Sequence, residues 1–293
     1  MQRQRGAALL MVLWLLILLA GLVSVFAFTA RVEAIQGSAL RAQVAGRLAA
    51  EAGIELAALR MADSDPQRRW YPDGRPQAFR FEGYDIEVRV QDESGKVDLN
   101  AADTSLLAAL LIALDVEPER AQQLAGAIQD WRDPDSLTAI GGGAEDRDYG
   151  AAGLPYGARD RPFATVQELQ QVLGMDLDTY RRLVPYVTIH TGMDRPSAEF
   201  AQAPVLRALG MGTGQVEQWL ALRAAWQPGM PPPMLPGEGL SLAGTGSGTY
   251  SVASRATRPD GSLVEVTATL RIGAGAGFGQ LYAPLAWRVG EPD

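Results

Sequence analysis

The sequence contains no cysteine. Disulfides, thiolate nucleophiles and cysteine-bound zinc or iron–sulfur sites are therefore excluded. Histidine occurs once, as His190, which excludes most catalytic triads and all multi-histidine metal sites. Excess positive charge is also missing: the formal net charge is −8, so the whole molecule does not attract the phosphates of nucleic acids. These absences leave few kinds of chemistry open to the chain.

Proline is absent from the first 62 residues, and charged residues are absent from Gly6 to Ala30. The apolar run is long enough to cross a bilayer as a helix, which takes roughly 20 residues. Arg3 and Arg5 on its short N-terminal side predict that this end stays in the cytoplasm. A secretory signal peptide, the alternative, has a shorter apolar core of about 7–15 residues. The segment therefore predicts a single transmembrane anchor.

The helical pattern continues beyond the apolar run. Arg47 can pair with Glu51 one turn later. Four apolar residues fall on one helical face: Val44, Leu48, Ala52 and Leu59. An unbroken helix of about 55 residues would reach roughly 80 Å at 1.5 Å per residue. Half of this helix would lie in lipid, and the other half would support the domain that follows.

Alternating apolar residues predict strands of one antiparallel sheet. The first runs from Tyr84 to Val90, and a pair over 250–252 and 264–272 is joined by a turn at 259–261. The middle of the chain, 100–227, has a helical pattern with weak internal repeats, and a proline-rich stretch over 228–240 predicts a stiff linker. We therefore predict an α+β fold: a long N-terminal helix, a sheet laid on it, and a large α-helical domain inserted between strands.

An acidic segment in the middle of the chain is the best candidate for a metal site. Glycines at 141–143 would let it wrap around an ion, and calcium prefers six to eight oxygen ligands. A solvated acidic loop is the alternative, because no EF-hand spacing is present. Asp133, Asp135, Glu145 and Asp146 are favoured as ligands. The complete candidate set is Asp130, Asp133, Asp135, Glu145, Asp146 and Asp148.

Two other functions have partial support in the residues. The helical repeats resemble helix-hairpin-helix units, as in membrane-anchored DNA receptors, but the hairpins at 173–176 and 209–212 match only partly and acidic residues surround them. Asp130 and Asp133 could form a carboxylate pair for glycoside hydrolysis, but no array of sugar-binding aromatic residues accompanies them. The sequence therefore predicts neither a nucleic-acid partner nor an enzyme, and no catalytic residue is assigned.

The N-terminus resembles that of a type IV prepilin. The pattern is Arg5-Gly6-Ala7 followed by a long apolar helix. In that family a prepilin peptidase cuts after the glycine and methylates the new amine, which implies cleavage between Gly6 and Ala7 here. Most pilins have glutamate at mature position five, whereas this chain has Met11. A subunit at the top of a filament has no neighbouring amine to neutralise such a carboxylate, so its absence has a physical reason.

The chain as a whole resembles the K-type minor pseudopilins of type II secretion, the GspK family. That family also departs from glutamate at mature position five. The motifs that carry the likeness occur in the family's order: 130–135 (Asp-Trp-Arg-Asp-Pro-Asp), 143–146 with Tyr149, 161–164, and Glu168-Leu169. Together with the N-terminus they cover nearly the whole chain.

This resemblance implies a type IV pilin-like fold with an inserted domain of SAM-like or helix-hairpin-helix units, and calcium in the acidic segment. It implies a structural role at the tip of the pseudopilus, in complex with I-, J- and H-type minor pseudopilins. The protein would be single-pass in the inner membrane, with its globular part in the periplasm. A minor pilin of a type IV pilus, or a competence-type DNA-binding protein, remains the alternative.

The expected organisation follows from the resemblance and the patterns together. It comprises a prepilin leader (1–6), the membrane and spine helix (7–62), the first part of the sheet (63–99), the inserted helical domain (100–227), the linker (228–240) and the second part of the sheet (241–293).

Overall fold

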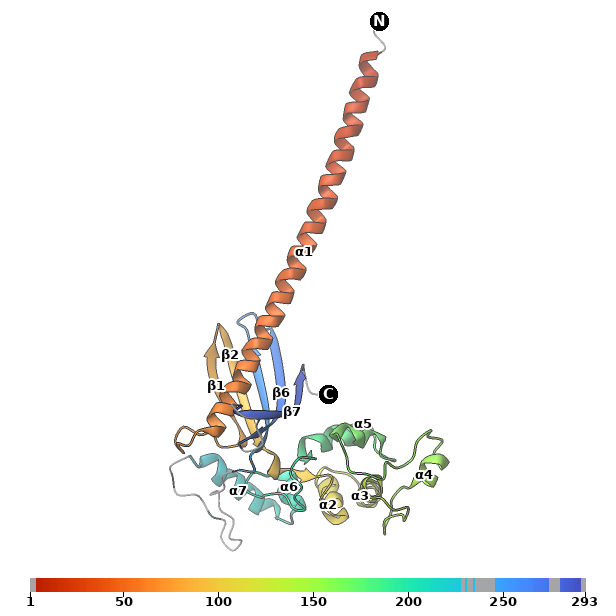
Figure 1. Ribbon diagram of the computed structural model, residues 1–293, viewed down its shortest axis with the longest axis vertical. Coiled ribbons are helices and arrows are strands. Elements are labelled where there is room, and N and C mark those ends of the chain that lie inside the picture. Colours follow the sequence, from red (N-terminus) through yellow and green to blue (C-terminus); the bar gives the residue numbers. More distant parts are fainter. Residues whose placement is uncertain (1–3, 228–229, 231–233, 235–245, 274–279, 291–293) are drawn as a thin grey trace.

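The computed structural model describes residues 4–227, 230, 234, 246–273 and 280–290 (Figure 1). Its longest element is α1 (Gln4–Ala62), which runs unbroken until the turn-forming residues that begin at Asp63. The predicted single helix is therefore confirmed. Its apolar first half projects away from the rest of the molecule, with every described side chain from Ala8 to Ala30 exposed. Among the described residues it is the one helix long and apolar enough to cross a membrane.

The second half of α1 packs on the sheet through small side chains. Gly53 shows why: a Cβ there would collide with the Ser254 hydroxyl and crowd Val88 on the sheet. Small residues allow this close approach, and the buried face comprises Gly46, Ala49, Ala50, Gly53, Ile54, Ala57, Ala58 and Met61. The apolar face expected from the sequence points elsewhere, because Val44, Leu48 and Leu59 are about half exposed.

The sheet has five antiparallel strands in the order β1-β2-β5-β6-β7. They are β1 (Asp73–Phe81), β2 (Tyr84–Asp92), β5 (Thr249–Thr257), β6 (Leu263–Ile272) and β7 (Tyr282–Val289). The three predicted strands correspond to β2, β5 and β6 and form the centre of the sheet. Their alternate residues are buried against α1, as the period of two requires. The two edge strands were not predicted.

Between β2 and β5 the chain forms a helical module with its own core, centred on Leu107, Leu110, Ile128 and Trp219. Its α-helices are α2 (Thr104–Ala113), α3 (Pro118–Arg132), α4 (Asp146–Ala151), α5 (Leu177–Leu183), α6 (Ala203–Ala208) and α7 (Thr213–Ala225). Short 3-10 helices lie at Glu93–Gly95, Val166–Gln171 and Val184–Tyr186, and β3 (Val97–Asp98) pairs in parallel with β4 (Val187–Thr188). The proline-rich linker at 228–240 lies almost entirely outside the described residues.

The helical module and the sheet module have separate apolar cores, joined by a polar seam. At its centre Glu93 accepts hydrogen bonds from Lys96 Nζ at 2.6 Å and from the hydroxyls of Ser251 on β5 and Thr188 on β4. Arg75 on β1 donates to the carbonyl oxygens of Trp226 and Arg223, each at 2.9 Å. These contacts fix the helical module on the end of the sheet (Figure 1).

Candidate metal centre

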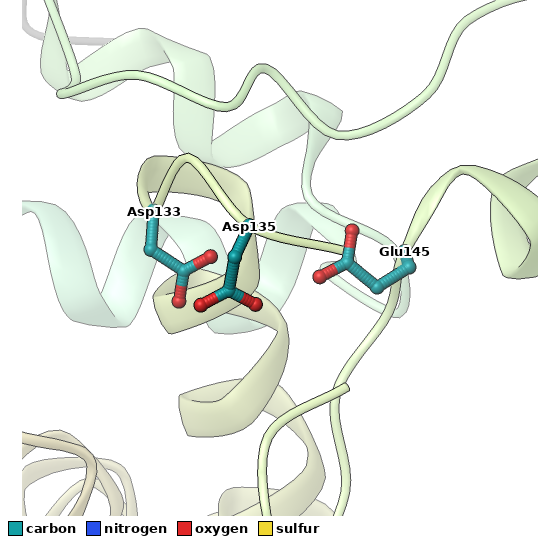
Figure 2. A group of neighbouring side chains, drawn as sticks. All are labelled: Asp133, Asp135 and Glu145. Carbon is teal, nitrogen blue, oxygen red and sulfur yellow. The ribbon is translucent and has the colours of Figure 1, made fainter. Parts of the chain in front are cut away.

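Three carboxylates from the acidic segment gather beside the C-terminus of α3, and we call them the acidic centre (Figure 2). Asp133 directly follows α3, Asp135 lies two residues further on, and Glu145 directly precedes α4. One oxygen from each lies within 4.8 Å of an oxygen from the others. The side chains point toward one another, so a single cation could contact all three.

Asp130 holds the loop that brings these residues together. It is fully buried in the last turns of α3 and accepts hydrogen bonds from the backbone amides of Ala139 at 3.1 Å and Ala144 at 2.9 Å. The loop passes so close to α3 that a Cβ at Gly143 would collide with the Asp130 carboxylate. Asp130, predicted as a ligand, therefore lies outside the group of three and fixes its supporting loop.

The other two predicted ligands also have separate positions. Asp148 accepts a hydrogen bond from the backbone amide of Glu145 at 3.1 Å, which caps the first turn of α4. Asp146 lines an adjoining cavity of about 330 Å³ together with Asp135 and Glu145. The structure thus divides the six predicted acidic residues into the acidic centre, one cavity residue and two residues that stabilise the backbone.

Asp160 is a member of this site that sequence reasoning missed. It lines the same cavity as Asp135, Glu145 and Asp146. Its φ of 55° is in the left-handed region, which aspartate tolerates better than most residues. Asp160 lies between two arginines in the sequence, so it does not belong to an acidic run. It reaches the cavity because the chain folds back toward the acidic centre after α4.

The acidic centre has unsatisfied oxygens. Glu145 Oε1 and Asp133 Oδ1 are buried and have no hydrogen-bond partner. Burial, and then the negative charges of Asp130, Asp133, Asp160 and Asp135, raise the pKa of Glu145 to about 7. Burial also raises the pKa of Asp130, although two backbone amides oppose that shift. Glu145 is buried, Asp133 is partly buried and Asp135 is exposed. A buried carboxylate without a partner is unfavourable unless a cation compensates it, and three carboxylates that converge are oxygen donors that fit calcium.

The remaining predicted site residues lie on α1. Met11, at the position where most pilins have glutamate, is largely exposed on the apolar half of the helix. Gly6 and Ala7 lie within the backbone of α1, but their side chains are outside the described residues. His190 is half-buried, and burial lowers its pKa.

Comparison with known proteins places this arrangement in a family context. Residues 87–192 match the family described as "Type II secretion system (T2SS), protein K". Type II secretion system protein K of Pectobacterium carotovorum subsp. carotovorum is 31% identical over 206 residues, covering 63% of this chain and 62% of that protein. The protein of the same name from Klebsiella pneumoniae is 33% identical over 206 residues, with the same coverage. The match therefore spans less than two thirds of these relatives' own length.

A solved structure extends the likeness to the fold. A chain in the crystal structure of the GspK-GspI-GspJ complex from the enterotoxigenic Escherichia coli type 2 secretion system matches with a TM-score of 0.58 and 20% identity. The alignment covers 90% of this chain and 99% of that chain. The family match contains the whole acidic centre. In sequence the chain is therefore similar to type II secretion system protein K over part of its length, and its fold is similar to that of a chain in the GspK-GspI-GspJ complex.

Proposed function

We propose that this protein is a minor pseudopilin at the tip of the type II secretion pseudopilus, with a structural role in starting or capping the filament. The observation that carries the proposal is the position of the helical module. It lies beyond the sheet, at the end of the molecule furthest from the N-terminus (Figure 1). A module of this size would be difficult to fit beneath another subunit in a filament of stacked helices, whereas the tip has no subunit above it.

The partners we propose are the I-, J- and H-type minor pseudopilins. The solved relative was crystallised as part of a GspK-GspI-GspJ complex, which supports the first two. In this chain the outward face of α1 supports contact with neighbouring helices, because Val44, Leu48 and Leu59 remain exposed after the sheet has covered the opposite face. A helix that packs along this face would bury apolar side chains that are otherwise in water.

The membrane arrangement follows from the same proposal. The exposed apolar half of α1 anchors the chain in the inner membrane, with the N-terminus cytoplasmic and the globular part periplasmic. Prepilin peptidase would cut between Gly6 and Ala7 and methylate the new amine. Comparing the intact mass of the protein expressed with and without active peptidase tests this, because loss of residues 1–6 and gain of one methyl group are expected. An uncut protein under both conditions would contradict processing.

We also propose that calcium binds the acidic centre. Asp133, Asp135 and Glu145 would hold it, with Asp146 and Asp160 close by at the cavity. The ion would supply the positive charge that compensates these carboxylates, of which Glu145 is buried. This would stabilise the loop between α3 and α4 and, through Asp130, the end of α3.

The helical repeats, of the SAM-like or helix-hairpin-helix kind, would serve as packing units of the helical module.

Assembly can be tested by copurification. The full-length protein, co-expressed with I- and J-type minor pseudopilins, is expected to purify with them from detergent. Val44→Asp combined with Leu48→Asp should reduce recovery of the partners, because charges on the outward face of α1 disfavour a helical contact. Leu263→Asp, at an exposed apolar residue on β6, is the matched control and should leave recovery unchanged. Equal recovery with all three proteins would contradict the proposed α1 contact, and no recovery with the wild type would contradict the complex.

A further inference from the structure

A pocket lined by hydrogen-bond donors lies where α1 ends and β1 begins. Its volume is about 420 Å³, within the range of ordinary ligand sites. Four arginines line it, Arg60, Arg68, Arg69 and Arg75, together with Trp70. We call it the arginine pocket. Among the described residues no aspartate or glutamate lines it, so an oxyanion would meet donors on several sides.

The arginines are only partly neutralised by the protein itself. Arg75 forms a close pair with Asp73, at 2.8 Å. Arg60 and Arg68 share the single carboxylate of Asp63, each at 3.8 Å, which is too long for a hydrogen bond. Arg69 is half-buried, and no ion pair of Arg69 occurs within the part of the chain that the structure describes. The pocket therefore retains positive charge in a protein whose net charge is −8.

A second cavity adjoins the arginine pocket, and Asp73, which pairs with Arg75 and Arg223, lines it. Its volume is about 370 Å³, it shares Arg75 with the arginine pocket, and it adds Arg89 from β2 and Arg223 from α7. Arg223 is buried and fixed by the carbonyl oxygens of Glu199 and Ala201, at 3.0 and 2.7 Å. The two cavities meet at the start of β1, which is an edge strand of the sheet. Arg89 also pairs with Glu87, at 3.0 Å, so the positive charge available to a ligand lies in the arginine pocket.

The position of the pocket excludes lipid as the ligand. Arg60 lies 30 residues beyond Ala30, the end of the apolar run, which is about 45 Å along a helix at 1.5 Å per residue. Phosphate headgroups at the membrane surface cannot reach that far. Nucleic acid is disfavoured because the rest of the molecule is acidic.

We infer that the arginine pocket binds an acidic, extended segment of a partner protein, with at least two carboxylates that face the arginines. Arginine forms bidentate pairs with carboxylates, and Trp70 offers a flat apolar surface for the stem of a glutamate side chain. The inference does not depend on the role in secretion, since it rests on the pocket alone.

Calorimetry on the full-length protein in detergent micelles tests this inference, with a hexaglutamate peptide as the probe and a hexaglutamine peptide as its neutral counterpart. Hexaglutamate should bind and hexaglutamine should not. The double variant Arg68→Glu/Arg69→Glu should weaken hexaglutamate binding at least about tenfold, because two pocket charges are reversed. Arg80→Glu, at an exposed arginine of β1 outside the pocket, is the matched control and should bind like the wild type.

Three outcomes would overturn the inference. Absence of hexaglutamate binding by the wild type is one, and unchanged binding by Arg68→Glu/Arg69→Glu is another. The third is binding of inorganic phosphate as tight as that of hexaglutamate, which would make the pocket a site for small anions. Circular dichroism of each variant checks folding, and the milder variant Arg69→Gln, with an expected smaller loss of affinity, replaces the double variant if that one unfolds. Copurification with minor pseudopilins remains a separate measurement.

Discussion

Two buried glutamates of this protein, Glu93 and Glu145, have opposite environments. Glu93, in the seam between the modules, is 2% exposed and receives hydrogen bonds from Lys96, Ser251 and Thr188. Burial by itself raises the pKa of Glu93, but these partners outweigh it and the pKa lies below its usual value. Glu145, in the acidic centre, is 8% exposed, and burial together with neighbouring carboxylates raises its pKa to about 7.

The two sites differ in whether the protein itself supplies partners for the carboxylate charge. The protein provides Glu93 with its own cation, Lys96, and with two hydroxyls from different strands. It provides the acidic centre with further negative charge and leaves two carboxylate oxygens without partners. A buried charge without compensation destabilises the folded state. The seam therefore holds the modules together with groups of its own, whereas the acidic centre has no cationic side chain of its own among its three carboxylates.

The largest effect is expected from Glu93→Ala. It leaves Lys96 without its partner in the seam, and breaking a buried pair in this way costs about 3–5 kcal/mol of unfolding free energy. Thermal unfolding of the full-length protein in detergent, followed by near-ultraviolet circular dichroism, measures the loss. Asp85→Ala is the matched control, because its pair with Arg80 is exposed and is worth at most about 1 kcal/mol. Equal losses for the two variants would remove the distinction between seam and surface.

Calcium is expected to raise the unfolding midpoint, by the equivalent of about 2.7 kcal/mol when its free concentration is 100 times the dissociation constant. Glu145→Gln should abolish most of that increase. Without calcium the same substitution should leave stability unchanged or slightly higher, because it removes an uncompensated charge. Without calcium, Glu93→Ala should therefore lower the free energy of unfolding, whereas Glu145→Gln should leave it unchanged or raise it slightly. A calcium response retained in Glu145→Gln would contradict the proposed site.

The two glutamates should also respond to pH in opposite directions. Because the pKa of Glu145 is raised in the folded state, its stabilising contribution is present below about pH 4.5 and is lost as pH rises toward 7. Because the pKa of Glu93 is lowered, its contribution is present above about pH 4.5 and is lost as pH falls through the lowered folded-state pKa.

Calcium competes with the proton on Glu145, so calcium affinity should fall by roughly tenfold or more from pH 7.5 to pH 5.5. Calorimetric titration at both pH values measures this change. Glu145→Gln is the reference, because glutamine has no carboxyl proton that competes with calcium. An affinity that does not change between the two pH values would contradict the role of Glu145 as a ligand.

The smallest effect is expected from Asp146→Asn. Asp146 lines the adjoining cavity but lies outside the group of three, so its charge acts on the ion only at longer range. Calcium affinity should fall by about threefold or less, since affinity depends on the charge and number of ligands. A loss as large as that of Glu145→Gln would move Asp146 into the set of direct ligands.

The predictability of the fold differs between the centre and the edges of the sheet. Strands β2, β5 and β6 follow from alternating apolar residues, because one of their faces is buried against α1. Strand β1 opens with Asp73-Gly74-Arg75-Pro76, and β7 contains Pro284, so proline interrupts the strand pattern in both. Proline is tolerated in these strands because an edge strand has one row of backbone groups without a partner strand. Such strands are recognised only from their neighbours.

The candidate site was predictable as a region and not as a set of ligands. The composition of the acidic segment indicates where the site lies. It does not distinguish Asp130 and Asp148, which stabilise the backbone, from the residues that converge. Those are Asp133, Asp135 and Glu145. Asp160 reaches the cavity from a stretch with no acidic pattern. Ligand sets depend on where side chains meet after the loop is fixed by contacts such as that of Asp130, and local composition contains no such information.

The sequence by itself determined the long helix, its exposed apolar half, the central strands and the absence of cysteine chemistry. Each depends on local periodicity or on residue counts. The tertiary structure alone decided which face of α1 the sheet covers and which buried carboxylates have partners. It also decided that arginines from α1, from the loop before β1 and from β1 form one pocket. These features require residues distant in the chain to approach within a few ångströms, and such distances are determined by packing.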